Sequence, residues 1–362
     1  MKSVTGKNIT LALYGESHGD AIGVVVDGLP AGIKIDTDFI GAQLDMRKPK
    51  GKISTQRREA DEFKITSGVF NGFSTGTPIH ITIPNTTQRS GDYQPQLPRP
   101  GHADYAAQVK YNGYQDYRGG GHFSGRLTAP IVAAGAIAID ILKNKGITIG
   151  THIKKCQNIC DRGFENYAED IALCNSKYFA TLDEAVGEAM QKHIEAIGAE
   201  CDSVGGVLET AVIGLEAGLG EPWFDTVESL LSHGLFAIPA IKGVEFGDGF
   251  GLASLRGSKA NDPFIICDGK VCTTSNRSGG INGGITNGMP IIFRCAVRPT
   301  PTIGKEQQTV NMQTGENATL QAKGRHDPCI VHRARVVVDA MTALTVCDLL
   351  SERHGTDWLG EV

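Results

Sequence analysis

Helical and strand-like patterns are interleaved along the whole 362-residue chain without strict alternation. Periodicity and capping signals predict helices over residues 37–46, 102–111, 126–145, 181–198, 225–232 and 328–350. Strand-like runs cover residues 22–26, 63–70, 79–83, 147–153, 207–213 and 290–297. A capping box from Thr181 to Glu184 is expected to open the fourth helix. Because a doubly wound parallel sheet requires regular alternation of strand and helix, this mixture favours a layered α+β fold.

One pattern occurs twice in the chain. A strand-like run, a Gly-Leu-x-Ala-Gly turn and a capped helix follow one another from Val25 to Thr37 and again from Val212 to Thr226. The repeat predicts two related sheet-plus-helix halves that share one core, and its alternative is a chance match in a glycine-rich chain. No low-complexity linker or change of composition divides the sequence, so we expect a single domain over residues 1–362.

Composition excludes several classes of protein. The net charge of −5 argues against a general nucleic-acid binder, which would usually be basic. The most apolar run, residues 129–142, is shorter than a membrane span and contains Asp140. Residues 1–14 contain no long apolar segment, which argues against a secretory signal, and the nine cysteines are scattered. We therefore expect a cytoplasmic protein with reduced thiols and no nucleic-acid or membrane partner.

Arginine, histidine and glycine gather in loops that suit an anionic ligand. The loops are residues 15–19, 99–105, 117–126, 298–302 and 324–329, and six cations lie within residues 47–58. Arginine grips phosphate or carboxylate with two parallel hydrogen bonds, and a histidine beside a bound phosphate can protonate it as it leaves. Taken singly, each loop is equally well explained as an ordinary turn or a solvated basic surface.

Signatures of other enzyme classes are missing from the sequence. No Gly-Lys-Ser/Thr follows the glycines at 119–121, so there is no Walker loop, and neither G-x-S-x-G nor HExxH occurs. His326, Asp327 and Cys329 lack a fourth metal ligand at a familiar spacing, so we expect no metal. The residues indicate an enzyme that handles phosphorylated anions by acid–base chemistry. The alternatives are a flavin- or nucleotide-binding regulatory protein, a kinase, and a structural or nucleic-acid-binding protein that uses the basic cluster.

Six motifs together make the chain resemble the chorismate synthase family over essentially its full length. They are residues 15–19 (GESHG), 56–59 (QRRE), 99–105 (RPGHADY), 118–121 (RGGG), 242–247 (KGVEFG) and 324–329 (GRHDPC). The resemblance implies a β–α–β sandwich of antiparallel sheets around helices, assembled as a homotetramer. It also implies a carbon–oxygen lyase that makes chorismate by 1,4-anti elimination of phosphate from 5-enolpyruvylshikimate 3-phosphate, the last common step of the shikimate pathway to aromatic amino acids. The family requires reduced FMN without net redox change. Some members reduce the flavin themselves with NADPH and others rely on an external reductant, and the lack of an added reductase domain in this sequence favours an external reductase with NADPH as the indirect reductant.

The resemblance also assigns expected roles to individual residues. His18 would protonate the reduced flavin, His102 would protonate the departing phosphate, and Asp327 would act as a base through the flavin. The expected substrate ligands are Arg47, Lys52, Arg126 and Arg325. The expected FMN contacts are Ser124, Ala240, Gly283, Arg298, Pro299, Thr300, Pro301, Thr302 and Arg325.

The chain departs from the family pattern at four positions in or next to these motifs. His122 and Phe123 replace an arginine and a serine, which puts the flavin contacts there in doubt. Arg298 stands where lysine is common and Lys52 where arginine is common, so charge is kept while hydrogen-bond geometry changes. We expect altered flavin affinity and retained activity.

Overall fold

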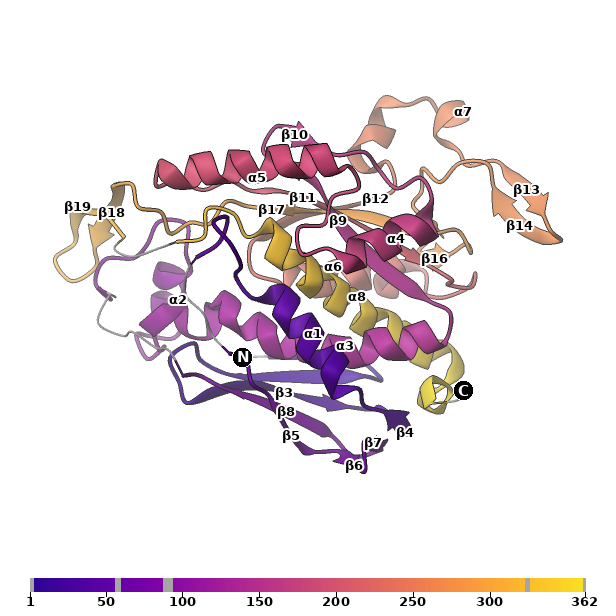
Figure 1. Ribbon diagram of the computed structural model, residues 1–362, viewed down its shortest axis with the longest axis horizontal. Coiled ribbons are helices and arrows are strands. Elements are labelled where there is room, and N and C mark those ends of the chain that lie inside the picture. Colours follow the sequence, from indigo (N-terminus) through magenta and orange to yellow (C-terminus); the bar gives the residue numbers. More distant parts are fainter. Residues whose placement is uncertain (1–2, 56–59, 87–93, 323–325, 361–362) are drawn as a thin grey trace.

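The computed structural model describes residues 3–55, 60–86, 94–322 and 326–360. Within these residues, two five-stranded antiparallel sheets enclose a layer of helices (Figure 1). The first sheet runs β1 (Val4–Thr5), β2 (Thr10–Gly15), β3 (Ala21–Asp27), β8 (Ile79–Pro84) and β5 (Lys64–Ser67). The second runs β10 (Ile159–Cys160), β9 (Thr148–Cys156), β11 (Gly206–Ile213), β17 (Ile291–Val297) and β12 (Ile241–Phe246). The enclosed helices are α1 (Thr37–Arg47), α3 (Thr128–Asn144), α6 (Val227–Phe236) and α8 (Val331–His354). The predicted layered α+β sandwich is confirmed.

The core forms where the inner faces of the sheets meet the helices. On β8, Ile79, Ile81 and Ile83 are buried and alternate with less buried residues, so one face of the strand packs against α3. Within the helical layer, α3 and α8 approach closely at Gly135, where a Cβ atom would lie 2.3 Å from the Cβ of Ala340. A larger residue at Gly135 would force these two central helices apart.

The predicted repeat is present as a repeated topology. Numbered by their order in the chain, the strands β2, β3, β5 and β8 lie in the order 1-2-4-3 across the first sheet. The strands β9, β11, β12 and β17 lie in the same order across the second sheet. In each half a helix follows the second strand, α1 or α6, and another follows the fourth, α3 or α8. The two halves therefore share one plan and contribute two helices each to a common layer.

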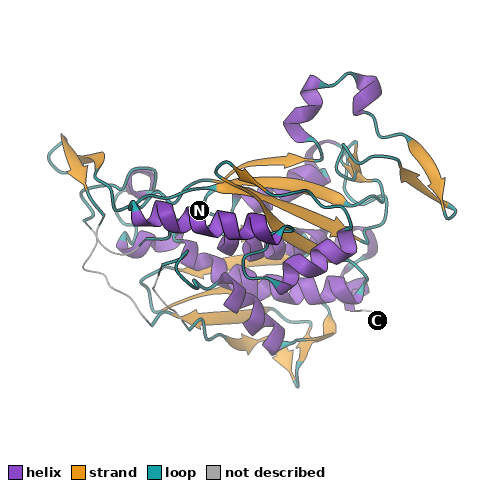
Figure 2. Ribbon diagram, turned by 45° about the horizontal axis from the view of Figure 1, so that its top comes forward, coloured by secondary structure: helices purple, strands orange, loops and turns teal. Residues whose placement is uncertain are grey.

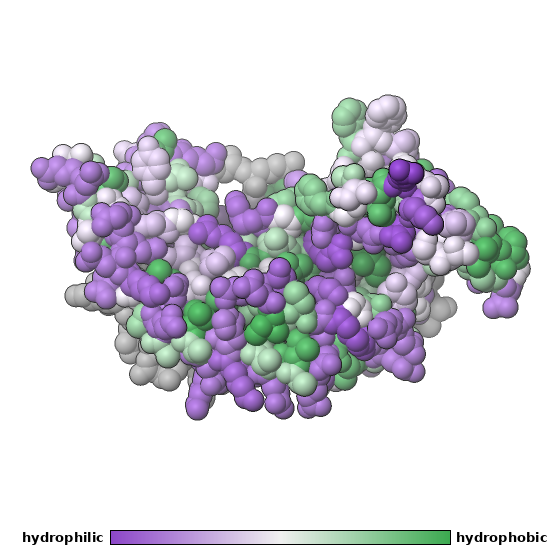
Figure 3. Space-filling view, turned by 90° about the horizontal axis from the view of Figure 1, so that it is seen from above, coloured by the Kyte–Doolittle hydropathy of each residue, from purple (hydrophilic) through white to green (hydrophobic). Residues whose placement is uncertain are grey.

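Further elements extend from this sandwich. The helices α4 (Tyr167–Ser176) and α5 (Glu184–Ala199) lie beside the second sheet, and α2 (Asp104–Lys110) precedes α3. Two hairpins project from the body, β13 (Phe264–Cys267) with β14 (Lys270–Thr273), and β18 (Gln307–Asn311) with β19 (Glu316–Leu320) (Figures 1 and 2). The first hairpin exposes Phe264, Ile266 and Val271, and it forms an apolar projection in Figure 3.

Several predicted boundaries were wrong for identifiable reasons. The strand expected over residues 63–70 ends at Ser67, because the chain turns at Gly68 with a φ of 81°. Val69 and Phe70 form β6 (Val69–Phe70), which pairs with β7 (Phe73–Thr75), and β7 pairs in turn with β4 (Ala31–Lys34) in a separate sheet. The expected capping box at Thr181 is displaced, since Asp183 caps α5 by accepting from the Val186 amide. The helix expected from residue 328 begins at residue 331.

The segment Gly125–Asn144 is long and apolar enough to cross a membrane by composition alone, so the expectation that no stretch approaches that length was too strict. In the structure 83% of this window is buried, and α3, which forms most of it, packs against α8 and the first sheet. Its apolar character is that of a core helix.

The two ends of the chain meet at one carboxylate. Asp348, in the last turns of α8, accepts hydrogen bonds from the backbone amides of Lys7 (2.9 Å), Asn8 (2.7 Å) and Ile9 (2.8 Å). These three residues lead directly into β2. The C-terminal helix therefore fixes the start of the first sheet.

Candidate functional site

A loop of three consecutive glycines forms the centre of the candidate site. Gly119, Gly120 and Gly121 have φ values of 62°, 83° and 53°, a region that side chains disfavour. A Cβ at Gly119 would lie 2.5 Å from the His18 ring, and one at Gly120 would lie 2.8 Å from Cε1 of His102. Glycine at these positions accommodates the positive φ values and leaves room for the two histidine rings. His18 and His102 therefore both pack against this one loop.

His18 reaches this loop from the end of β2. The backbone amide of Ser17 donates to the Gly121 carbonyl at 3.1 Å, which ties the two segments together. Ser17 and His18 are only 2% and 3% exposed. His18 therefore faces the interior of the site, where a bound molecule would shield it from solvent.

His102 is oriented by a neighbouring carboxylate. Its Nδ1 lies 2.8 Å from Oδ1 of Asp104 and 3.1 Å from Nη2 of Arg99. Burial raises the pKa of Asp104, but hydrogen bonds from Arg99 and His102 outweigh it and hold that pKa well below its ordinary value. Because an ionised carboxylate accepts a hydrogen bond, Nδ1 carries a proton and Nε2 is the nitrogen available to a ligand. Asp104 belongs to the predicted motif, but its contact with His102 was not foreseen.

Two arginines expected to bind substrate share a buried carboxylate. Nη2 of Arg47 donates to Oδ2 of Asp61 at 2.7 Å, and Nη1 of Arg126 donates to Oδ1 of the same residue. Burial lowers the pKa of Arg47 and alone would raise that of Asp61. The charges of both arginines outweigh burial at Asp61, so its pKa lies below the ordinary value. The group is a buried cluster of two cations and one anion.

Asp327 lies beside this cluster. Its Oδ1 accepts from the backbone amide of Thr55 at 2.8 Å, and its Oδ2 accepts from Nη1 of Arg333 at 2.7 Å. Nε of Arg333 donates to the carbonyl of Arg47 at 2.9 Å, which links the start of α8 to the end of α1. Asp61 and Arg333 were both missed from the sequence. Two sequence signals could have indicated them. Asp61 comes shortly after the basic cluster at residues 47–58, and Arg333 lies near the start of the last helix.

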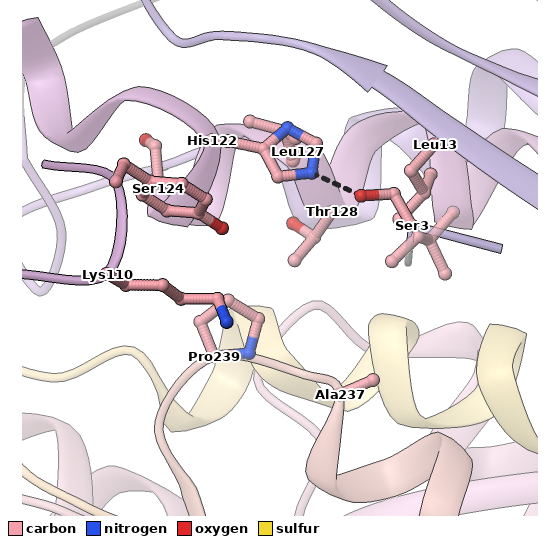
Figure 4. A pocket seen from close by; sticks show the side chains of 11 residues that line it. Ser3, Leu13, Lys110, His122, Ser124, Leu127, Thr128, Ala237 and Pro239 are labelled. Carbon is pink, nitrogen blue, oxygen red and sulfur yellow. Dashed lines mark hydrogen bonds between the residues drawn. The ribbon is translucent and has the colours of Figure 1, made fainter. Parts of the chain in front are cut away.

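A cavity of about 340 Å³ opens beside the glycine loop (Figure 4). Its lining residues are Ser3, Leu13, Lys110, Tyr111, His122, Ser124, Leu127, Thr128, Ile131, Ala237 and Pro239. His122 Nδ1 donates to the Gly15 carbonyl at 2.8 Å, so its Nε2, at 3.0 Å, accepts from the Ser3 hydroxyl. His122 thus joins the N-terminal segment to the loop, and Ser124 lies on the cavity wall (Figure 4).

The segment after β17 also reaches this region. The Arg298 amide donates to the Ala240 carbonyl at 3.0 Å, and Nη1 of Arg298 donates to the Gly101 carbonyl at 2.7 Å. Gly101 directly precedes His102, so Arg298 and Ala240 lie close to the glycine loop. The hydroxyl of Thr300 is buried without a hydrogen-bond partner among the residues that the structure describes.

The other expected residues are placed less centrally. Gly283 lies next to the start of α6, where the Gly284 carbonyl accepts from the Val227 amide, whereas Ala240 follows the other end of that helix. Lys52 is exposed in the turn after α1. Arg325 and the motif at 56–59 lie outside the described residues. Pro299, Pro301 and Thr302 flank Thr300 in an extended connection.

Within the described ranges no three of His, Cys, Asp and Glu are grouped so that they could hold a metal ion. What the fold brings together is a glycine loop with an oriented and a buried histidine against it, paired arginines, and three engaged carboxylates, those of Asp61, Asp104 and Asp327. Such a group of side chains is suited to binding an anionic small molecule and to acid–base chemistry, which indicates an enzyme.

Comparison with known proteins identifies the class more closely. Residues 9–350 match the family model described as chorismate synthase. A chorismate synthase of Thermococcus kodakarensis is 45% identical over 359 residues, covering 99% of both chains, and one of Dehalococcoides mccartyi is 47% identical over 353 residues, covering 96% of both. A solved crystal structure of chorismate synthase superposes with a TM-score of 0.76 at 28% identity, covering 97% of this chain and 94% of that one. The chain belongs to the chorismate synthase family of carbon–oxygen lyases.

Proposed function

We propose that this chain eliminates phosphate from 5-enolpyruvylshikimate 3-phosphate to give chorismate, a step towards the aromatic amino acids. The observation that carries the proposal is the meeting of His18 and His102 at adjacent glycines of one loop. Beside that loop lie Arg47 and Arg126, and Arg47 Nε is buried without a hydrogen-bond partner among the described residues. A buried cationic donor of this kind suits a phosphate or carboxylate of the substrate.

We further propose that FMN binds beside the glycine loop. The buried hydroxyl of Thr300 is a donor that fits a phosphate, and Ser124 faces a cavity with apolar walls at Leu13 and Leu127. Arg298 and Ala240 complete this side of the proposed site. When bound in its reduced form, FMN supplies an electron transiently and recovers it, so the reaction has no net redox change.

In this proposal the side chains divide the proton chemistry. His102, held through Nδ1 by Asp104, donates its Nε2 proton to the departing phosphate. His18, buried against Gly119, holds a proton towards the flavin. Asp327 is the base, and the Thr55 amide and Arg333 fix its orientation while each carboxylate oxygen keeps a lone pair.

The experiment is an anaerobic assay of the purified protein with 5-enolpyruvylshikimate 3-phosphate. Parallel samples contain chemically reduced FMN, oxidised FMN, or oxidised FMN with NADPH. We expect phosphate and chorismate only with reduced FMN, because the flavin must lend an electron. Product in the sample with NADPH would contradict the expectation of an external reductase. If the substrate binds but no sample forms product, the proposed function is contradicted.

We also propose that the chain is a single cytoplasmic domain that assembles as a homotetramer. The helical layer is shared by both sheets, which supports one domain. The apolar projection of Phe264, Ile266 and Val271 supports association with further copies. Sedimentation measured with and without FMN tests the assembly, and a monomer under both conditions would contradict it.

A further inference from the structure

Asp61 joins the two arginines from a buried position. Its side chain is fully buried, and each of its oxygens contacts a different guanidinium, one from Arg47 and one from Arg126. The backbone of Asp61 has a φ of 51°, a conformation that most side chains avoid. Strained residues of this kind persist where the surrounding structure requires them, and they concentrate at functional sites.

Arg126 is constrained on all sides of its guanidinium. Nε donates to Oδ1 of Asn85 at 3.1 Å, Nη1 donates to Asp61, and Nη2 lies 3.4 Å from the carbonyl of Pro84. Asp61 supplies the only charged acceptor among these partners. Its carboxylate is therefore one of the groups that hold the cation of Arg126 in place.

Arg47 is held less completely. Nη2 donates to Asp61 at 2.7 Å, and Nη1 reaches the hydroxyl of Thr128 at a weak 3.4 Å. Nε is buried and makes no hydrogen bond to any residue that the structure describes. Arg47 is thus fixed at one nitrogen by Asp61 while another nitrogen stays available to an anion.

Charge counting shows what Asp61 does to the pair. Two arginines remain protonated even when buried, so these three described side chains carry +2 from the cations and −1 from Asp61, a net charge of +1 among themselves. Arg333 and Asp327 next to it form a pair of their own at 2.7 Å and add no net charge. Without Asp61 the two guanidiniums would repel each other and would attract any small anion more strongly.

We propose that Asp61 is a positioning residue that holds Arg47 and Arg126 in their catalytic geometry and limits their attraction for simple anions. The inference rests on the proposed function of the same site. It assigns Asp61 a role through the arginines, with no contact to the substrate required.

The test separates anion affinity from turnover. In Asp61→Asn the charge is lost and the shape is kept, so we expect inorganic phosphate to bind about 10-fold more tightly as net charge rises. Turnover should fall about 100-fold, because the guanidiniums lose their fixed geometry, while KM for the substrate does not rise. Phosphate is titrated calorimetrically in the presence of saturating oxidised FMN, so that the flavin phosphate site is filled.

The matched control is Asp45→Asn. Asp45 makes an ion pair with Lys48 at 2.6 Å one helical turn away, and its side chain is 59% exposed. Phosphate affinity and turnover should both match the parent protein, since exposed ion pairs contribute little. Equal shifts in Asp45→Asn and Asp61→Asn would overturn the proposal, because the effect would then be a general one of net charge.

A second variant keeps the proposal testable if Asp61→Asn does not fold. Asp61→Glu retains the charge and adds one methylene, so phosphate affinity should equal that of the parent while turnover falls about 10-fold. The proposed role of Asp61 would be overturned if Asp61→Glu kept the parental turnover. It would also be overturned if Asp61→Asn kept both the parental phosphate affinity and the parental turnover. Absence of chorismate formation by the parent would instead count against the proposed function, since phosphate titration does not depend on activity.

Discussion

Each half of the molecule buries a three-residue ionic cluster, and the two clusters have opposite composition. In the first half, Asp61 lies between Arg47 and Arg126. In the second half, His152 lies between Asp161 and Glu209, with Nδ1 at 3.2 Å from one carboxylate and Nε2 at 3.0 Å from the other. All of these residues are at most 8% exposed. Among these buried members one cluster has an excess of cations and the other an excess of anions, and the less buried Arg294 reaches Glu209 at 3.6 Å.

The surroundings of the clusters explain the difference. Asp161 also accepts from the backbone amides of Leu182 at 2.6 Å and Asp183 at 3.1 Å, so the second cluster joins β9 and β11 to the start of α5. Burial lowers the pKa of His152, but its two carboxylate partners outweigh burial and raise that pKa above the ordinary value. In the first cluster, by contrast, Nε of Arg47 has no hydrogen-bond partner in the part of the chain that the structure describes. Buried charge alone therefore does not mark a functional site.

The largest effect is expected from Arg126→Met, which breaks the first cluster. Asp61 would keep only one cationic partner, so the free energy of unfolding should fall by about 3–5 kcal/mol. Turnover of 5-enolpyruvylshikimate 3-phosphate should fall at least about 100-fold, because a cation of the proposed site is lost. Denaturant unfolding and the anaerobic assay measure the two effects, and a stable variant with parental turnover would contradict the functional role of the first cluster.

Asp161→Asn tests the second cluster with the same kind of change. Because His152 would lose one charged partner, the free energy of unfolding should fall by about 2–3 kcal/mol. Turnover and KM should stay at parental values at temperatures where the variant is folded, since the cluster lies within the sheet. A loss of turnover larger than the loss of folded protein would show that the two clusters do not differ in function.

The third prediction uses pH. The raised pKa of His152 means that its stabilisation is complete below about pH 6.5, the unfolded value, and is lost as pH rises through the folded pKa. Stability should therefore decline from pH 6.5 to 8.5, by at most about 1.4 kcal/mol per pH unit from this group. Thermal melts across this range should show a smaller decline in His152→Gln. The range stops at 8.5 because burial raises the pKa of Cys174 and Cys295 to about 12, so thiols also favour unfolding in stronger alkali.

The smallest effect is expected at His122, which lines the cavity in the first half. His122→Arg restores the residue common in the family and adds a permanent cation beside the proposed flavin site. Oxidised FMN should bind about 3- to 10-fold more tightly, as expected for one added charged hydrogen bond. His122→Gln is the matched control, because it adds no charge and should bind FMN as the parent does. Flavin fluorescence measures the FMN affinity of each variant. Identical affinities in His122→Arg and the parent would show that this position does not contribute to flavin binding.

The sequence was sufficient for the framework and for part of the site. The helices α1 and α3 were predicted to within about two residues, because caps and apolar periodicity marked them clearly. The helix α4 was missed, since polar residues interrupt its apolar pattern. The strand order within each sheet was not predicted, and it became visible only when the repeated topology could be compared.

Residue partnerships could not be predicted in the same way. His18 and His102 were recognised from their motifs, but their meeting at Gly119 and Gly120 depends on how β2 and α2 pack. Asp61 follows the basic cluster in sequence, and nothing in the pattern connects it to Arg126, 65 residues later. Such contacts arise from tertiary packing, where local sequence carries little information. Other assigned contacts, such as Gly283 with FMN, stay predictions.

The bonds from Asp348 to the first residues of β2 have a consequence for synthesis of the chain. A ribosome releases residues 7–9 more than three hundred residues before it releases their partner. During that interval the first sheet lacks both its anchor and α8, which covers the core of both halves. The nascent protein therefore exposes apolar surface until its final helix emerges. A ribosome stalled just before residue 331 should leave a chain that proteases cut readily and that chaperones bind.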